Sequence, residues 1–361
     1  MPSDCGSAGA SPSLVGQFLI HLGLIIVLAG MNAGVLLAAE DYDTVIVATG
    51  QDGRGRLKRQ GTVVDYSRDG LRLLQFGRET NIPAEKIIDV QTTLTEDQKS
   101  GDREMAEEDF AQALVYFNKV IEARKEQRDW VLTRMFAAMV RCYLGLHQRE
   151  EAAEVFLRLV RADPDTPYFD HIPLAWTAGE TQQPRQAFTW LSQRDNAAAM
   201  LLGASHLLAT GERSSAVTTL ERLRRHPEAL VARLAEAQLW RTEVVTASSQ
   251  QVDLWQRRLE EFPESLRGGP WYVAAQALAR NNRHEEAALA AMRVAILHAH
   301  DRTLAAEALL VAAKSLTEIN QTDEASSVYR EIVEQYPEAR AKSEAEQRLA
   351  DLSARKRHGS H

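Results

Sequence analysis

The pattern of apolar and polar residues changes twice along the chain and predicts three regions of different structure. An apolar run from 14 to 37 is followed by short stretches of alternating polarity up to about residue 93. From about residue 94, apolar residues recur at the spacing of amphipathic helices, in paired segments with short polar breaks. We therefore expect a mainly α-helical protein with the following divisions: a signal peptide or transmembrane anchor (1–39), a small β domain (41–93), helical repeats (94–340), a capping helix (341–353) and a disordered tail (354–361).

The apolar run 14–37 contains twenty-four residues without Asp, Glu, Lys or Arg. As a helix, it is long enough to cross a bilayer core of about 30 Å. Ala38 and Ala39 precede acidic Glu40 and resemble a signal-peptide cleavage region. Residues 1–13 hold no Lys or Arg and the run is longer than an ordinary signal core, so an uncleaved anchor is the alternative to a cleaved signal peptide. Both interpretations place the body of the chain outside the cytoplasm, periplasmic or secreted, with or without a membrane anchor.

Four runs between residues 43 and 91 predict β-strands, because they are β-branched or alternate in polarity and are separated by turn signals. They are Asp43–Ala48, Gly61–Tyr66, Leu71–Phe76 and Lys86–Gln91. We expect a compact domain of about five short strands. The order of these runs resembles the small SH3-like and Sm-like barrels, in which a bent hairpin precedes a strand that closes the barrel. This resemblance implies a fold more than a function.

Residues 51–59 read QDGRGRLKR and place four cations, Arg54, Arg56, Lys58 and Arg59, close together among glycines. A basic loop of this kind favours an anionic ligand, so an alternative function is that of a polysaccharide-associated or nucleic-acid-associated module. The spacing lacks both the Gly-Lys-Ser/Thr ending of a phosphate-binding loop and the G-x-G-x-x-G of a dinucleotide site. The other interpretation is a solvated hairpin tip whose charges prevent strand pairing with other chains.

The predicted helices repeat in pairs, and six of seven second helices carry an alanine four residues before a bulky or otherwise apolar residue. The pairs are Ala113 with Phe117, Ala152 with Phe156, Ala187 with Leu191, Ala216 with Leu220, Ala287 with Ala291 and Ala325 with Tyr329, with Gln251 and Trp255 as a degenerate seventh. These positions fall 39, 35, 29, 35, 36 and 38 residues apart. A small residue lets two helices approach closely, and the larger residue fills the gap to the next hairpin. Self-similarity at this period predicts stacked helical hairpins.

The repeat resembles the tetratricopeptide repeat (TPR). Tyr143, Ala152, Phe156 and the closing Asp163-Pro164 occupy the places that the family uses, and Gln335-Tyr336-Pro337 repeats the ending. The resemblance implies a right-handed α-solenoid that is a non-enzymatic scaffold for protein binding. The last hairpin also looks like the repeats of periplasmic TPR proteins associated with the Tol-Pal system or with outer-membrane assembly. The expected partner is therefore another protein of the bacterial cell envelope.

One stretch, residues 164–196, departs from the repeat. It contains Pro167, Pro173, Gly179 and Pro184, and the spacing that follows it is only 29 residues. Proline interrupts helices because it lacks the N–H donor and clashes with the preceding turn. We expect an irregular or shortened hairpin here and a hinge between two sub-arrays.

Charge and motif spacing give no support for catalysis. The formal net charge is −8, and residues 41–93 hold eight acidic and eight basic side chains, so the acidic excess lies mainly in the helices and bulk nucleic-acid binding is disfavoured. His298 and His300 stand two residues apart on a predicted helix, about 200° apart around its axis, which argues against a shared metal. We expect no enzyme activity, no cofactor and no metal. The oligomeric state is left open.

A binding groove along the first helices is the expected functional surface. From the positions of the repeated alanines, we predict that nine side chains of the first helices lie near this groove: Arg134, Arg141, Trp176, Arg233, Trp240, Tyr272, Gln276, Arg280 and Lys314. Aromatic residues and arginine are common at binding hot spots. For Trp176 and Trp240, packing between repeats is an equally good interpretation, because a shift of one residue would turn either ring inward.

Overall fold

The computed structural model describes residues 42–50, 54–124 and 126–358, with the side chains from 355 onward left aside. The predicted targeting segment, 1–39, lies outside the described residues. Within these ranges, no helix combines the length and apolar character that a membrane crossing requires. From Asp43 onward the chain forms one compact unit.

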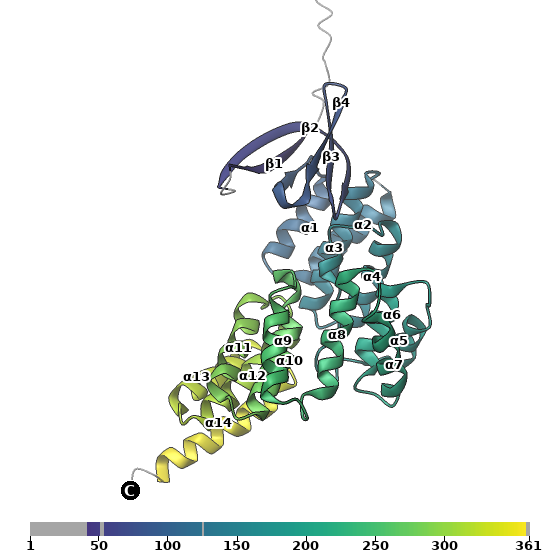
Figure 1. Ribbon diagram of the computed structural model, residues 1–361. Helices are drawn as coiled ribbons and strands as arrows, with labels where there is room; N and C mark the ends of the chain where they lie inside the picture. The colour runs from purple at the N-terminus through teal and green to yellow at the C-terminus, as the bar shows by residue number, and fades with distance from the viewer. Residues whose placement is uncertain (1–41, 51–53, 125, 359–361) are drawn as a thin grey trace, which may run out of the picture. The chain divides into compact units, whose positions relative to one another are not determined.

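The unit begins with an antiparallel sheet of five strands in the order β4-β3-β2-β1-β5 (Figure 1). The strands are β1 (Asp43–Thr49), β2 (Gly55–Ser67), β3 (Gly70–Gln75), β4 (Arg78–Pro83) and β5 (Ile87–Gln91). The N-terminal half of β2 pairs with β1, and its C-terminal half pairs with β3. Three predicted strand boundaries were wrong. β2 reaches back to Gly55, Phe76 lies in the β3–β4 turn rather than in a strand, and Lys86 ends the short 3-10 helix that precedes β5.

The sheet does not close into the predicted barrel. The edge strands β4 and β5 do not pair with each other in the described part of the chain. The apolar face of the sheet, which includes Val45 and Leu73, packs instead with Trp130 and Val131 at the start of α3. Because a helix covers this face, burial of the sheet core does not require a closed barrel.

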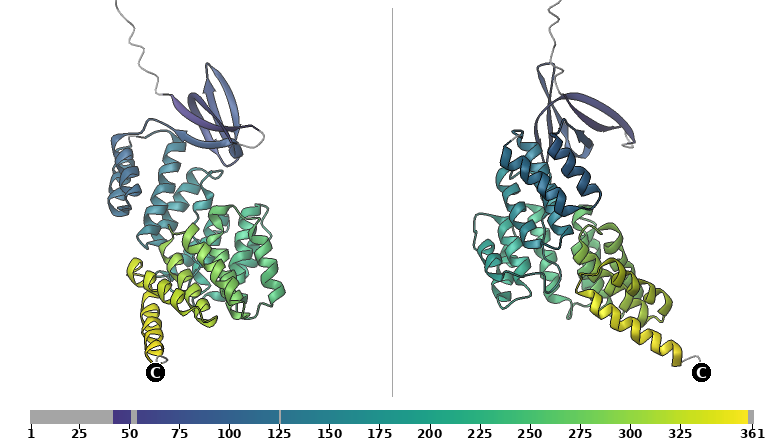
Figure 2. Two further views of the ribbon diagram at one scale, coloured as in Figure 1. Left: turned by 90° about the vertical axis from the view of Figure 1, so that its left-hand side faces the viewer. Right: turned by 180° about the vertical axis from the view of Figure 1, so that it is seen from behind.

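Fourteen α-helices follow among the described residues, and most of them pack against the next helix in sequence (Figure 2). The first helices of the hairpins are α1 (Glu96–Ala106), α3 (Asp129–Gly145), α6 (Ala197–Leu207), α8 (Ala229–Glu243), α10 (Gly268–Arg280) and α12 (Arg302–Glu318). The second helices are α2 (Phe110–Ala123), α4 (Arg149–Ala162), α5 (Pro184–Leu191), α7 (Arg213–Leu223), α9 (Ser249–Leu259), α11 (His284–Leu297) and α13 (Thr322–Gln335). The last helix, α14 (Ala341–His358), continues past Ser353, where the sequence pattern ended it.

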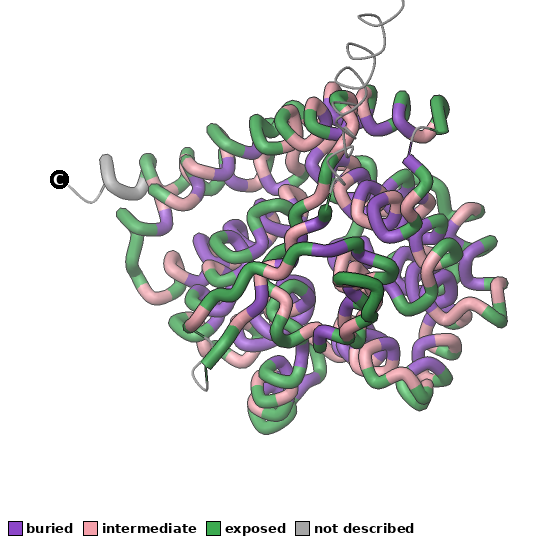
Figure 3. The backbone as a smooth tube through the Cα atoms, turned by 90° about the horizontal axis from the view of Figure 1, so that it is seen from above, coloured by how far each residue is buried: buried purple, intermediate pink, exposed green. Residues whose placement is uncertain are grey.

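The repeated alanines fill the packing positions expected of them, and buried residues line the inward sides of the helices (Figure 3). All six alanines are completely buried, and so are Phe156 and Leu220, which follow two of them by four residues. Gln251 differs because it is exposed and forms the capping box at the start of α9 with Ser248. The periodic pattern therefore identified second helices correctly in all seven units.

The irregular unit lacks a first helix. Of the predicted third hairpin only α5 is present, with eight residues. The short 3-10 turn η2 (Phe169–His171) and an extended segment replace the partner helix. This confirms the expected shortened hairpin.

Candidate functional site

An extended segment, residues 163–183, runs along several helices and is called the strap here. Its central residues Leu174 and Ala175 are buried. The Ala175 N–H donates to Ser205 Oγ at 3.1 Å, and the Ala175 carbonyl accepts from Gln238 Nε2 at 3.1 Å and from Arg241 Nη1 at 2.8 Å. Side chains of α6 and α8 thus satisfy backbone groups that a helix would satisfy internally. The prediction of a hinge was wrong, because the strap is held on both sides.

The strap also reaches α4 and α10. Glu150, in the first turn of α4, accepts hydrogen bonds from the N–H groups of Gln182 and Gln183 at 2.8 and 2.6 Å. The indole of Trp176 lies on Gly269 so closely that a Cβ at that glycine would be 1.9 Å from a ring carbon. The protein's own strap therefore covers part of the first-helix surface on which a groove was expected.

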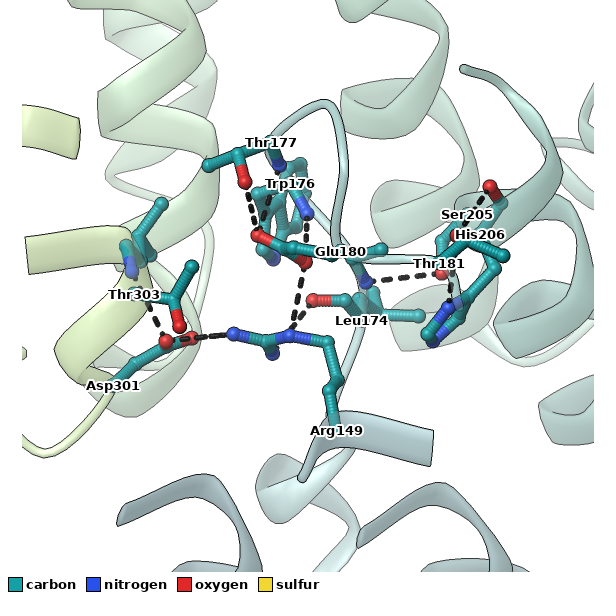
Figure 4. Close-up of polar contacts among 12 residues, drawn as sticks. Arg149, Leu174, Trp176, Thr177, Glu180, Thr181, Ser205, His206, Asp301 and Thr303 are labelled. Atoms are coloured by element: carbon teal, nitrogen blue, oxygen red, sulfur yellow. Dashed lines mark hydrogen bonds and ion pairs between the residues drawn. The ribbon is translucent and has the colours of Figure 1, made fainter. Parts of the chain in front are cut away.

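A buried arginine joins the strap to a distant part of the array (Figure 4). Arg149, at the start of α4, donates to both carboxylate oxygens of Asp301 at 2.6 and 2.7 Å. Its Nε lies 2.9 Å from Glu180, and its Nη1 donates to the Leu174 carbonyl at 3.0 Å. The Arg149 side chain is only 7% exposed. One guanidinium thus links α4, the strap and the residue that caps α12.

The charges in this network hold one another in the ionised state. Burial disfavours the charged form of Asp301, but Arg149 outweighs burial and lowers the pKa of the carboxyl. Burial likewise disfavours the Arg149 cation, and Asp301 and Glu180 reverse that effect, so its pKa is raised. Glu180 also accepts hydrogen bonds from the N–H groups of Trp176 and Thr177. The network therefore fixes the conformation of the strap through paired charges.

Beside this network lies a cleft with a volume of about 240 Å³. Its lining comes from α3, the strap, the α9–α10 connection, the start of α10, the α11–α12 connection and the start of α12. It includes Val140, Arg141, Leu144, Asp170, His171, Ile172, Leu266, Gly268, His298, His300, Asp301 and Leu304. Apolar walls with a few polar groups are the usual character of a recognition site.

Three side chains of the cleft, Arg141, His298 and His300, have no hydrogen-bond or ion-pair partner among the described residues, although the two histidine rings contact each other. Arg141 is exposed, and no hydrogen-bond or ion-pair partner for it exists among the described residues. His298 is only 5% exposed, and its ring nitrogens likewise have no hydrogen-bond partner in the described ranges. Burial, and next the neighbouring His300, lower the pKa of His298, so its ring is neutral near pH 7. An incoming side chain could therefore use both groups.

His298 and His300 are closer together than the sequence analysis predicted. α11 ends at Leu297, so neither histidine is in a helix, and their ring centroids lie 6.1 Å apart. The argument from helical geometry was therefore wrong. Across the described residues, no group of three or more His, Cys, Asp or Glu side chains is placed to hold a metal ion.

The nine predicted groove residues do not form one surface. Only Arg141 and Trp176 line the cleft. Trp240 and Tyr272 are buried, and Trp240 stacks on Trp255 with ring centroids 5.1 Å apart, as the packing alternative predicted.

The remaining five predicted residues lie elsewhere, four of them with partners of their own. Lys314 pairs with Glu344 at 2.7 Å, and Arg134 lies 3.6 Å from Asp102. Arg233 donates to the Glu261 carbonyl, and Gln276 donates to the Tyr272 hydroxyl. Arg280 is exposed near the end of α10 and does not line the cleft.

The basic residues of the predicted loop belong mostly to β2. Arg56 and Lys58 stand opposite Ala48 and Ile46 of β1, while Arg59 stands opposite Val45. Successive residues of a strand point to opposite faces, so Arg59 faces away from the other two. Arg54 lies just before the strand and is exposed. One continuous basic surface made of all four residues is therefore not present.

The sequence analysis missed Arg149, Glu180 and Asp301 as a group. Asp301 had a local signal, because its side chain caps α12 by accepting from the Leu304 N–H at 3.1 Å. The pairing of Arg149 with Asp301 and Glu180 had none, since these residues lie far apart in sequence.

Two segments of the chain match family models described as tetratricopeptide repeat, at residues 104–172 and 307–339. The first match extends from α1 into the strap, and the second covers part of α12 and all of α13. No curated protein matches the chain. TPR families are typically non-catalytic scaffolds that bind other proteins, and neither match indicates an enzyme family.

Proposed function

We propose that the chain is a non-enzymatic scaffold of the cell envelope that binds a partner protein through the cleft. The two TPR matches support protein binding. The envelope setting rests on the charge-free run 14–37, which is typical of an export signal or anchor. The body of the protein would then work outside the cytoplasm, at or near a membrane.

The observation that supports the cleft as the binding place is that both the exposed Arg141 and the buried ring of His298 line it, and neither has a hydrogen-bond or ion-pair partner among the described residues. Apolar side chains such as Leu266 and Leu304 surround these groups. An acidic side chain from the partner would form a charge-assisted hydrogen bond with Arg141. Its apolar neighbours would pack on the leucines.

Site-specific photo-crosslinking in cells that naturally make the protein tests this proposal. A photoreactive residue replaces Arg141, and a control chain carries it at Arg280, which is also exposed but lies outside the cleft. We expect a discrete adduct with one protein from position 141 and none from position 280. Mass spectrometry identifies the adduct.

Charge reversal then tests the contact with the identified partner. R141E should weaken binding by roughly tenfold or more, because a hydrogen bond to a charged group contributes about 1.5–3 kcal/mol. R280E should have no effect on binding. Thermal stability should stay unchanged in both variants, because neither arginine has a partner within the described residues. Equal adducts from both positions, or equal affinities of R141E and wild type, would refute the cleft as the binding site.

A further inference from the structure

Helix α11 carries a cluster of apolar side chains that are exposed to solvent. Leu289, Ile296 and Leu297 are 60%, 68% and 57% exposed. Every other helix in the described ranges has at most one large apolar side chain that is exposed. Single exposed apolar residues are ordinary on a protein surface, whereas a cluster of them marks an interaction site. The cluster on α11 therefore points to a binding partner.

The cluster lies on the side of α11 that the array leaves open. The helix packs against α10 and α12, and its buried residues include Ala287, Ala291 and Val294. Leu289 and Ile296 fall between these buried positions and are seven residues apart, so they share one side of the helix. This side is called the α11 face here.

Two charges of opposite sign flank Leu289 on the α11 face. Glu285 stands four residues before Leu289 and Arg293 four residues after it. Both charged residues are exposed, and neither has a hydrogen-bond or ion-pair partner within the described residues. The guanidinium of Arg293 lies over the ring of Trp271, with its central carbon 4.9 Å from the ring centroid. The rise of the helix places each charge about 6 Å from Leu289 along the axis.

A second copy of α11 in antiparallel orientation fits this charge pattern. When a two-fold axis passes beside Leu289, each Leu289 meets its counterpart, and Glu285 of each copy stands opposite Arg293 of the other. Both ion pairs then form together, and Ile296 of each copy reaches the start of α11 in the other. A partner of uniform charge, acidic or basic, would satisfy only one of the two charges and repel the other.

We propose that the chain forms a two-fold dimer through the α11 face, centred on Leu289. Each copy contributes one helix, so the interface is small and the dimer is reversible. Glu285, Leu289, Arg293 and Ile296 do not line the cleft at Arg141. The dimer is therefore independent of the proposed binding to the cleft.

Charge exchange tests the pairing of Glu285 with Arg293. Full-length chains that carry donor or acceptor fluorophores are titrated in detergent, and energy transfer reports their association. E285R alone and R293E alone should each weaken self-association by about tenfold or more, because two attractions in every dimer become two repulsions. A mixture of E285R chains with R293E chains should recover the wild-type affinity to within about threefold, because opposite charges meet again. Loss of folding in either variant could not be reversed by such mixing.

Glu324 provides the matched control for charge reversal. It is an exposed acidic residue in the first turn of the next second helix, α13, and has no hydrogen-bond or ion-pair partner in the described part of the chain. E324R should therefore self-associate with the affinity of wild type.

A cysteine at position 289 tests the position of the two-fold axis. In a Cys5→Ser background, L289C should form a disulfide-linked dimer when an oxidant is added, because the axis brings the two side chains together. The remaining cysteine, Cys142, is buried. The control is V115C, because Val115 is 45% exposed on another second helix, α2. V115C should stay unlinked.

Several results would overturn the dimer. These are wild-type chains that stay monomeric, charge variants that associate as well as wild type, a mixture that associates no better than either variant alone, and the absence of a crosslink at position 289. A crosslink from L289C to a different protein in cells would assign the α11 face to another partner and overturn the dimer as well. None of these outcomes changes the adduct expected from position 141, so the dimer and the cleft can fail separately.

Discussion

Replacement of Arg149 by methionine tests whether the buried charge network holds the strap in place. The side chain of Arg149 is 7% exposed, and those of its partners Asp301 and Glu180 are 11% and 4% exposed. R149M keeps most of the side-chain volume but removes the ion-pair partner of two buried carboxylates, Asp301 and Glu180. Breaking a buried ion pair in this way costs about 3–5 kcal/mol.

The cost converts into a measurable change in melting temperature. The unit from Asp43 to His361 contains about 320 residues. At about 2.1 cal/mol/K per residue, its unfolding entropy is roughly 0.67 kcal/mol/K. R149M should therefore melt about 4–8 °C below wild type in differential scanning calorimetry. The strap should also become accessible to protease.

Arg283 provides the matched control. It pairs with Asp253 and Glu286, each at 2.6 Å, but those carboxylates are 44% and 48% exposed. Exposed pairs contribute about 0–1 kcal/mol, so R283M should lower the melting temperature by no more than about 1.5 °C. Equal effects of R149M and R283M would refute the reasoning.

The pH dependence supplies a second check on R149M. In wild type the pKa of Asp301 is lowered, so its contribution to stability is present above the ordinary value of 3.8 and is lost as pH falls through the depressed value. In R149M, burial without the Arg149 cation should raise the pKa of Asp301. Protonation of Asp301 as pH falls then removes the buried unpaired charge and reduces the destabilisation of the variant. The difference in melting temperature between wild type and R149M should therefore narrow from pH 7 towards pH 4. A difference that stays constant with pH would contradict this account.

Two further predictions concern the packing of the strap. Gly269→Ala places a methyl group 1.9 Å from a ring carbon of Trp176. The variant should lose about 1–3 kcal/mol of the free energy of unfolding, and its strap should become accessible to protease. Gly211→Ala is the control, because Gly211 has open space around it. Burial lowers the pKa of His206 to about 3, whereas the unfolded histidine titrates near 6.5. The free energy of unfolding should therefore fall as pH drops below about 6.5, by up to about 1.4 kcal/mol per pH unit. Urea denaturation between pH 7 and pH 5 should show a smaller slope for His206→Leu than for wild type.

The repeat pattern predicted the helices well because the spacing of small and large residues reflects packing within single helical turns. A helix that packs against two neighbours needs a small residue where they approach, and Ala152 and Phe156 show this spacing within a single turn. The same argument identified the poorly formed third unit from its prolines. The β domain was predicted less well, because Phe76 continues an apolar run and carries no turn signal of its own.

Adjacency in sequence proved a poor guide to adjacency on the surface. Arg56, Lys58 and Arg59 form a compact basic run, but β2 includes all three, and the pleat sends Arg59 to the opposite face. Conversely, Arg149 and Asp301 are 152 residues apart and meet at 2.6 Å. Their meeting depends on how the hairpins curve around the strap, which no short window of residues encodes.

The binding surface was the part that repeat counting could not predict, and the strap explains why. Counting back from each alanine assumes that every unit has a first helix whose exposed side lines a groove. The third unit has no such helix, so Trp176 belongs to the strap and packs on Gly269 of α10. Because the strap covers part of the first helices, the proposed binding surface is the part that the strap leaves open. That surface is the cleft at Arg141, which borders the strap itself, and any partner bound there contacts both the array and the segment that replaces its missing helix.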